Sequence, residues 1–214
     1  MASLEQQYSL KNQLSITDLS VFRSETPIFS PVSFTLSAGE CIQVRGHNGA
    51  GKTTLLRAVC GLNQNFEGQI CWNGESIFKQ SADYYQSLLY IGHHLGLKPK
   101  LTAEQNLNFY RKLRFPADKT SILNALSQFG IGDYFDETVA YMSAGQKRRV
   151  ALSRILTEPV PFWILDEPMV ALDIDGQKSL EGHCNQHLNK GGMLLITSHQ
   201  PISGIQNLQE VTLT

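Results

Sequence analysis

The run Gly46–Thr54 has the residue types and the spacing to hold the phosphates of a nucleotide. It reads Gly-His-Asn-Gly-Ala-Gly-Lys-Thr-Thr and fits the pattern Gly-x-x-x-x-Gly-Lys-[Ser/Thr]. Glycines let the backbone curl so that successive N–H groups point at phosphate oxygens. Lys52 would reach the β- and γ-phosphates, and the Thr53 hydroxyl would bind Mg²⁺. We therefore expect a nucleotide such as ATP, with Mg²⁺, as the ligand of the loop residues Gly46, His47, Asn48, Gly49, Ala50, Gly51, Lys52, Thr53 and Thr54. The loop alone does not choose among kinases, GTPases and motors, which all share it.

Two adjacent carboxylates, Asp166 and Glu167, follow the apolar run Phe162–Leu165. An aspartate at such a strand end lies beside the Mg²⁺ in nucleotide hydrolases that use a phosphate loop. Glu167, one residue further, could polarise the attacking water as a general base. A surface-facing acid pair is the alternative, and the phosphate loop makes it the weaker one. The adjacent glutamate favours water as the acceptor, so the pair predicts hydrolysis over a kinase reaction.

Compact apolar strands and one helix must position these side chains. The strands Cys41–Arg45, Phe162–Asp166 and Met193–Thr197 are apolar enough to be buried on both faces of a parallel sheet. The helix after the loop, about Lys52–Cys60, would point its positive dipole end at the phosphates. All three strands are followed by polar or glycine-containing residues, which is where α/β proteins carry their chemistry.

The rest of the chain predicts an antiparallel sheet near the N-terminus and a helical insertion. Leu14–Thr17 and Val32–Leu36 alternate apolar and polar residues, and Asn73-Gly74 is a hairpin signal after Ile70 and Trp72. Helix signals in the next stretch are the capping pair Thr102 and Gln105, the stripe Ile122, Leu123, Leu126 and Phe129 ending at Gly130, and the stripe Leu152, Ile155 and Leu156. We predict one α/β domain over residues 1–214, with a helical subdomain at about 84–156.

The segment Ser143-Ala144-Gly145-Gln146 opens a helix with a cap-like serine. Taken alone, it is an ordinary capping box. Its place in the chain changes that interpretation, because it is one of several segments that follow one another in a known order. These are the phosphate loop, the helical insertion, Ser143–Gln146, Asp166-Glu167, Ala171-Leu172-Asp173 and His199. In that order the chain resembles the ATP-binding-cassette (ABC) ATPases over nearly its whole length. The resemblance implies the ABC type of P-loop NTPase fold, with a mostly parallel core sheet, an N-terminal antiparallel β subdomain and a helical insertion.

The resemblance also implies that the ATP site is shared between two copies. Two nucleotide domains pair head to tail, so that each ATP lies between the loop at Lys52 and Ser143–Gln146 of the second copy. His199 contacts the γ-phosphate, and Asp173 couples the two sites.

Two positions depart from the usual pattern of this family. His93 stands where most members have a glutamine that senses Mg²⁺ and the membrane partner. Most members also stack a tyrosine on adenine, and here Phe22 or Arg23 occupies that region. Either could pack on the base, Arg23 by its planar guanidinium, and the sequence does not choose between them.

Several blocks are similar to one group of ABC ATPases, the group that serves bacterial cytochrome c maturation and haem export. The blocks are Tyr90–His93, Gly96–Lys98, Leu101–Leu107, Phe109-Tyr110, Met142–Arg154, Phe162–Pro168 and Gly191–Pro201. The similarity implies a peripheral subunit at the cytoplasmic face of the inner membrane, bound to integral membrane transporter subunits. Its ATP hydrolysis would support haem export or delivery. The alternatives are an ABC ATPase for a lipid, lipoprotein or drug, and a soluble ABC ATPase that acts on ribosomes or DNA.

Composition limits the alternatives. Hydrophobic residues make up 42% of the 214 residues, which is enough for a sizeable core. The net charge of −1 gives no electrostatic reason to expect nucleic acid as a partner. No apolar stretch approaches the roughly 20 residues of a membrane-spanning helix, so we expect a cytosolic chain.

The cysteines and the two helical histidines do not form a convincing metal-binding site. The cysteines Cys41, Cys60, Cys71 and Cys184 are scattered, which indicates buried or idle thiols. His183 and His187 share one helix but lack a third ligand, which argues against a metal or haem site.

Overall fold

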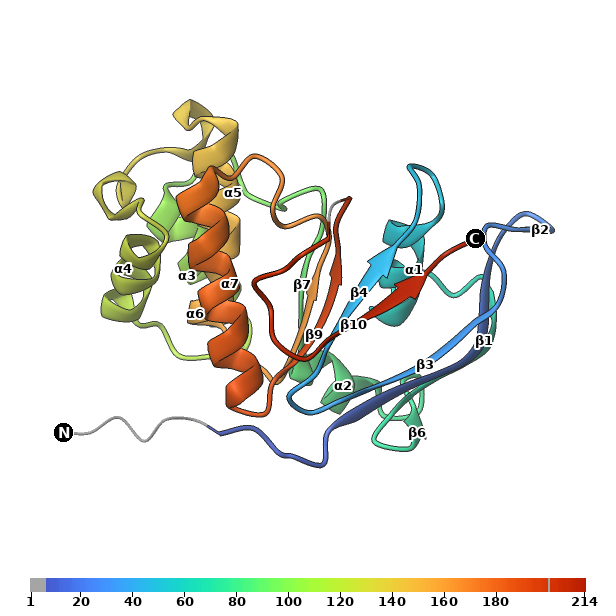
Figure 1. Cartoon of the computed structure of the whole chain (residues 1–214). Coiled ribbons are helices and arrows are strands. Elements are labelled where there is room, and N and C mark those ends of the chain that lie inside the picture. Colours follow the sequence, from blue (N-terminus) through green and yellow to red (C-terminus); the bar gives the residue numbers. More distant parts are fainter. Residues whose placement is uncertain (1–6, 200) are drawn as a thin grey trace. The chain divides into compact units, whose positions relative to one another are not determined.

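The computed structural model describes residues 7–199 and 201–214, which fall into two compact units (Figure 1). The first unit holds the described residues up to Tyr90, then Val160–Asp166, and the chain from Cys184 onward. The second unit holds Ile91–Pro159 and Glu167–His183. The chain passes between the units several times, and one of these crossings is at the peptide bond that joins Asp166 to Glu167.

An antiparallel sheet forms the N-terminal part of the first unit, as the alternating pattern predicted. Its central strand β1 (Gln13–Arg23) pairs with three strands, and β5 also pairs with β6. The other strands are β2 (Thr26–Pro27), β3 (Val32–Ser37), β5 (Phe66–Trp72) and β6 (Glu75–Ser76). Asn73 and Gly74 join β5 to β6 with φ angles of 52° and 85°, the left-handed turn that the Asn-Gly pair predicted.

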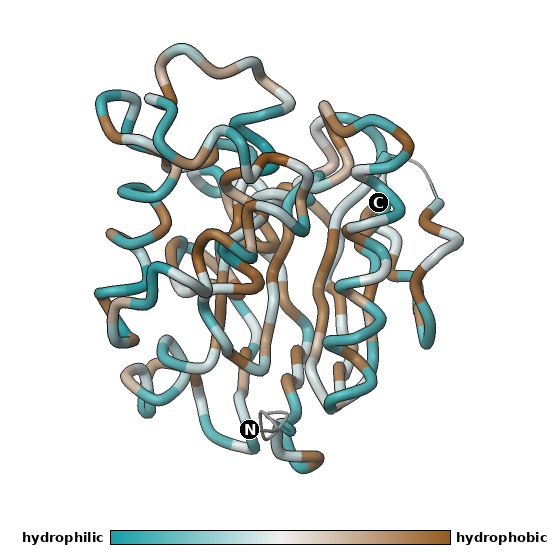
Figure 2. The backbone as a smooth tube through the Cα atoms, turned by 90° about the vertical axis from the view of Figure 1, so that its left-hand side faces the viewer, coloured by the Kyte–Doolittle hydropathy of each residue, from teal (hydrophilic) through white to brown (hydrophobic). Residues whose placement is uncertain are grey.

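The second sheet of this unit supplies the strand ends that matter for function. Its order is β10-β4-β9-β8-β7, and β10, β4, β9 and β8 are parallel neighbours. The strands are β4 (Cys41–Arg45), β7 (Leu88–Ile91), β8 (Phe162–Leu165), β9 (Met193–Thr197) and β10 (Leu208–Thr212). β8 and β9 are buried along their whole lengths, and Figure 2 shows long brown stretches along the central strands. The three predicted core strands are confirmed.

The sequence did not predict β7 and β10. Leu88–Ile91 is a short apolar run inside the stretch that was predicted to be mostly helical, and four residues are too few to display a period. β10 is the last strand in the sheet order and three of its five residues are exposed, so it lacks the apolar pattern of the inner strands.

Helix α1 (Lys52–Val59) follows the predicted phosphate loop and is anchored in the core of the first unit. Leu55, Leu56 and Val59 are fully buried. Each such side chain contributes about 1.5–3 kcal/mol relative to an exposed one. The hydroxyl of Tyr84, in α2 (Ser81–Ser87), donates to the Val59 carbonyl at 2.7 Å. These contacts fix the axis of the helix that begins at Lys52.

Helices make up most of the second unit. They are α3 (Ala103–Lys112), α4 (Lys119–Gln128), η1 (Gly132–Tyr134), η2 (Val139–Tyr141), α5 (Ala144–Leu152), α6 (Arg154–Thr157) and the first part of α7 (Ile174–Asn189). The capping box predicted at Thr102 is confirmed, and Gly130 follows α4 with a φ of 68°. The stripe Leu152, Ile155 and Leu156 spans two helices, because Ser153 interrupts them and its hydroxyl donates to the Arg149 carbonyl at 2.8 Å.

Candidate active site

Three neighbouring parallel strands of the first unit end at one edge of their sheet. β9 lies between β4 and β8, so the segments that follow these strands share that edge. The segments are the loop after Arg45, the Ser198-His199 pair after β9, and Asp166 after β8. The sheet therefore brings the loop, the aspartate and His199 to the same edge.

The phosphate loop has a backbone that only glycine adopts readily. Gly49 and Gly51 have φ angles of 86° and 95°. A Cβ on Gly51 would also lie 2.7 Å from the Phe29 ring. The Lys52 ammonium is curled into the loop, where it donates to the carbonyls of Gly46 at 2.9 Å and His47 at 3.3 Å. The lysine is only 7% exposed, so its charge lies inside the loop.

Asp166 is fully buried and both of its oxygens accept a hydroxyl hydrogen bond. The Thr53 hydroxyl donates to Oδ2 at 2.8 Å, and the Thr197 hydroxyl donates to Oδ1 at 2.7 Å. A hydroxyl and a carboxylate oxygen in direct contact are ligands of the kind that Mg²⁺ takes, so these residues fit that ion. Thr197 was not predicted. The only signal for it was its place at the end of a core strand, two residues before His199.

Glu167 has a left-handed backbone with a φ of 50°. For a residue with a side chain this conformation is uncommon and costs about 1 kcal/mol or more, so surrounding contacts must hold it. The Glu167 carbonyl accepts hydrogen bonds from the Arg148 guanidinium and from the Val170 N–H. A strained backbone held in this way is often found at functional sites.

The predicted signature segment Ser143–Gln146 forms the first turn of α5. Ser143 Oγ accepts from the Gln146 N–H at 3.2 Å, and Gln146 Oε1 accepts from the Ser143 N–H at 2.8 Å. The capping box that the sequence allowed is therefore present. Ala144 is exposed, whereas a Cβ on Gly145 would lie 3.0 Å from the Ala171 carbonyl. The segment is thus packed against the turn that contains Asp173.

Asp173 both caps a helix and pairs with an arginine of α5. Its Oδ1 accepts from the Gly176 N–H at 2.8 Å and from the Arg149 guanidinium at 2.6 Å. The Arg149 guanidinium also donates to the Phe129 carbonyl at 2.5 Å. Arg148 and Arg149 were not predicted as part of the site, although both lie in the block that carried the family resemblance.

His93 and the region predicted to contact adenine are open to solvent. His93 is exposed, and its ring centroid lies 5.7 Å from that of His94. A hollow of about 320 Å³ on the first unit is lined by Phe22 and Arg23. Its other lining residues are Ile28, Thr54, Arg57, Leu62 and Asn63. Because Thr54 is part of the phosphate loop, this hollow continues from the loop toward both residues named for adenine.

Each unit carries its own set of predicted site residues. The first unit holds Gly46–Thr54, Asp166 and His199, and the structure adds Thr197. The second unit holds His93, Ser143, Ala144, Gly145, Gln146, Glu167 and Asp173.

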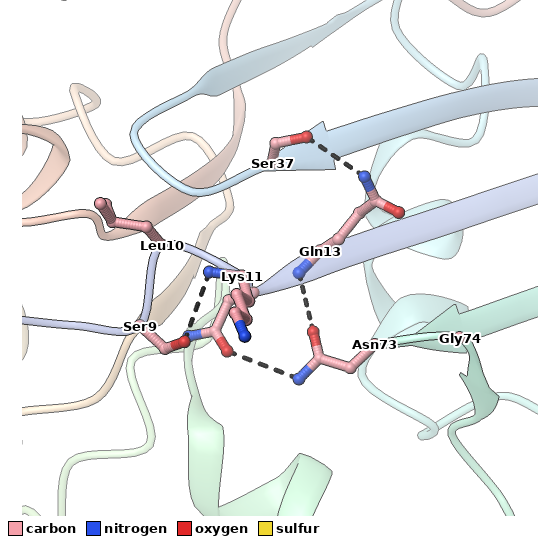
Figure 3. Close-up of a pocket in the computed structure, with 8 residues that line it drawn as sticks. Ser9, Leu10, Lys11, Gln13, Ser37, Asn73 and Gly74 are labelled. Atoms are coloured by element: carbon pink, nitrogen blue, oxygen red, sulfur yellow. Dashed lines mark hydrogen bonds between the residues drawn. The ribbon is translucent and has the colours of Figure 1, made fainter.

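A second hollow lies at the start of β1 and shares no residue with these sets (Figure 3). It has a volume of about 650 Å³. Several of its polar groups bond to one another, as where the Gln13 N–H donates to Asn73 Oδ1 at 2.8 Å and Asn73 Nδ2 donates to Asn12 Oδ1 at 3.4 Å. These bonds fasten the start of β1 to the β5–β6 turn.

The two helical histidines serve packing. His187 stacks on Trp163 with ring centroids 3.6 Å apart, and burial lowers its pKa to about 3. His183 packs on Phe129 with centroids 5.2 Å apart. Within residues 7–199 and 201–214, no three His, Cys, Asp or Glu side chains are grouped to hold a metal ion.

Comparison with protein families identifies the arrangement. Residues 29–170 match the family model described as ABC transporter. The chain is 44% identical to the cytochrome c biogenesis ATP-binding export protein CcmA of Mannheimia succiniciproducens, over 89% of each chain. It is 42% identical to the protein of the same name from Escherichia coli K12, over 94% of this chain and 96% of that one.

Solved structures agree with this comparison. An ABC transporter ATP-binding protein from Pyrococcus furiosus superposes with a TM-score of 0.81 at 26% identity, covering 92% of this chain and 96% of that one. An ATP-binding subunit of an ABC transporter gives a TM-score of 0.77 at 27% identity, over 87% and 79%. No helix in the described part of the chain is long and apolar enough to cross a membrane.

Proposed function

This chain belongs to the ABC transporter family of ATP-binding proteins, and we propose that it is the ATP-hydrolysing subunit of a cytochrome c maturation system that exports or delivers haem. The observation that carries the proposal is the 42% identity, over 94% of the chain, to a cytochrome c biogenesis ATP-binding export protein. The predicted fold and the predicted ATPase activity agree with it. An ABC ATPase with another cargo is the alternative outcome of the tests below.

In the proposed mechanism the phosphate loop binds ATP and the core carboxylates prepare hydrolysis. Loop N–H groups and Lys52 hold the β- and γ-phosphates. Thr53 and Asp166 hold Mg²⁺, which when bound supplies positive charge against the phosphate oxygens. Their 2.8 Å contact supports this assignment. Glu167 takes a proton from the attacking water, and His199 contacts the γ-phosphate.

The site is completed by a second copy of the chain in this proposal. Ser143, Ala144, Gly145 and Gln146 of one copy face the ATP bound by the other copy. The exposed N-terminal turn of α5 supports this, because its N–H groups and positive dipole end favour an anion. Asp173 couples the two sites of the pair.

Adenine lies in the hollow beside the phosphate loop in this scheme. Phe22 offers an aromatic face and Arg23 a planar guanidinium, and both line the hollow. Exchanging each residue for alanine and measuring ATP affinity separates the two assignments.

The chain works at the cytoplasmic face of the inner membrane, bound to integral membrane subunits. His93 takes the place of the family's glutamine, and its exposure leaves it accessible to such a partner. Residues 1–214 act as a single nucleotide-binding domain, of which about 84–156 form the helical subdomain. Deleting the gene should leave c-type cytochromes without covalent haem. Normal c-type cytochromes in that strain would point to another cargo.

The hydrolysis step is tested with Glu167→Gln. This variant should bind ATP normally and hydrolyse it at least about 100-fold more slowly, because a general base contributes roughly 10²–10⁴-fold. Nucleotide affinity and phosphate release are measured on the same preparation. Glu181→Gln, a change on α7 outside the site, serves as the control and should turn over at the normal rate. Near-normal turnover by Glu167→Gln would remove Glu167 from the role of base.

A further inference from the structure

One buried arginine of the second unit contacts the backbone beside two predicted site residues, the general base Glu167 and the sensor position His93. Arg148 lies in α5 and is 5% exposed. Its Nε donates to the Pro168 carbonyl at 3.2 Å, and its Nη1 reaches the Gly92 carbonyl at 3.5 Å. Its Nη2 donates to the Glu167 carbonyl. All four residues belong to the second unit, so these contacts lie within one compact body.

Only an arginine can make this set of contacts. The guanidinium is planar and carries five N–H donors in a fixed geometry, whereas a lysine ammonium is a compact charge on a flexible stem. Moving a charged group from water into the protein interior costs free energy unless hydrogen bonds compensate it. The carbonyls therefore have to stay in place around Arg148, and Arg148 in turn holds them.

The residues that it holds are the ones whose orientation affects the reaction. The Glu167 carbonyl belongs to the peptide group that joins Glu167 to Pro168, and the backbone of Glu167 itself is in the left-handed region. Fixing the plane of that peptide group limits where the Glu167 carboxylate can point. Gly92 directly precedes His93, and the helix of Arg148 begins at the signature segment Ser143–Gln146. One side chain thus joins the signature helix to the base and to the sensor position.

We propose that Arg148 is a positioning residue for ATP hydrolysis, which holds the backbone of Glu167 so that its carboxylate meets the attacking water. The inference rests on the proposed role of Glu167 as the general base. Arg148 does not touch nucleotide in this scheme and acts through Glu167. Its loss should therefore lower the rate of hydrolysis while leaving ATP binding unchanged.

The test compares Arg148→Gln with Arg111→Gln in the full chain assembled with its membrane partners. Arg111 is the matched control, because its guanidinium also donates to backbone carbonyls of the second unit, those of Pro116 and Thr157, away from Glu167. Arg148→Gln should lower kcat about 10- to 100-fold with a KM for ATP within about twofold of normal. Arg111→Gln should change neither by more than about twofold. Equal loss of kcat in both variants, or a loss that appears in KM, would overturn the proposal.

A double variant separates positioning from general damage. In a single-turnover assay, Arg148→Gln added to Glu167→Gln should slow hydrolysis no more than about twofold further, because residues that act as a unit are not additive. If Arg148→Gln slows the Glu167→Gln protein by as large a factor as it slows wild type, the positioning role of Arg148 is overturned and the base assignment of Glu167 still stands. Normal turnover by Glu167→Gln by itself would instead overturn the base assignment and the inference with it.

Arg148→Lys keeps the comparison valid if the glutamine variant does not fold. The lysine retains a buried charge but cannot reach three carbonyls, so kcat should again fall with KM unchanged. Full kcat in the lysine variant would contradict the proposal, because a charge alone would then be sufficient.

Discussion

At the scale of single residues, the geometry around Asp166 depends on two hydroxyls. Thr53 and Thr197 come from segments far apart in the sequence, and each binds a different oxygen of the carboxylate. Thr53 was predicted from the loop pattern. Thr197 was not, because a threonine in an apolar strand is usual and only the pairing of β8 with β9 shows which residue it faces.

Thr197→Val should weaken Mg²⁺ binding while preserving the shape of the side chain. The change removes the hydrogen bond to Asp166 Oδ1 inside the core, which costs about 1–3 kcal/mol of stability. Loss of a partner that orients a metal ligand typically costs 10–100-fold in metal affinity or activity. The Mg²⁺ concentration that half-saturates ATPase activity should therefore rise about 10-fold. Thr197→Ser keeps a hydroxyl and should stay close to normal, and an unchanged Mg²⁺ dependence in the valine variant would remove Thr197 from this role.

His187 should make folding stability depend on pH. Burial lowers its pKa from 6.5 to about 3, so between these values the unfolded chain takes up a proton that the folded chain does not. The contribution of His187 to stability should therefore be constant above about pH 6.5 and fall below it, by up to about 1.4 kcal/mol per pH unit. His187→Phe keeps a ring on Trp163 and should flatten that part of the pH profile in urea unfolding. An equal slope in wild type and His187→Phe would contradict the assignment.

At the scale of elements, the strongest local signals predicted the structure well. The glycine-rich loop, the apolar strands beside it and the Asn73-Gly74 turn each depend on neighbours in the sequence, so their residues report them directly. The exposed edge strand β10 and the four-residue β7 depend on pairing partners far along the chain, and local pattern could not supply these. The break at Ser153 was missed because the apolar stripe continues across it.

The first turn of α5 combines a structural and a proposed binding role, and two substitutions of Ser143 separate them. Ser143→Ala removes the cap and should cost about 1 kcal/mol of stability. Ser143→Arg loses the same cap and adds bulk and charge where a second copy would approach. It should bind ATP as a monomer with near-normal affinity and show no turnover. A monomeric preparation that hydrolyses ATP at the full rate would contradict the head-to-tail scheme.

At the scale of the whole molecule, each of the two compact units carries some of the predicted site residues. The peptide bond between Asp166 and Glu167 joins the proposed Mg²⁺ ligand of one unit to the proposed base of the other. The sequence predicted both residues from one motif but gave no sign that they belong to different compact bodies. That division follows from packing, since β8 pairs into the sheet and the chain from Glu167 packs with α5.

The central claim is that ATP hydrolysis by this chain supports the attachment of haem to c-type cytochromes. The most direct measurement is covalently bound haem in c-type cytochromes of a deletion strain that expresses wild type, Glu167→Gln or Glu181→Gln at equal levels. The account predicts that wild type and Glu181→Gln restore covalent haem and that Glu167→Gln does not. Full restoration by Glu167→Gln, or normal covalent haem in the uncomplemented deletion strain, would contradict it.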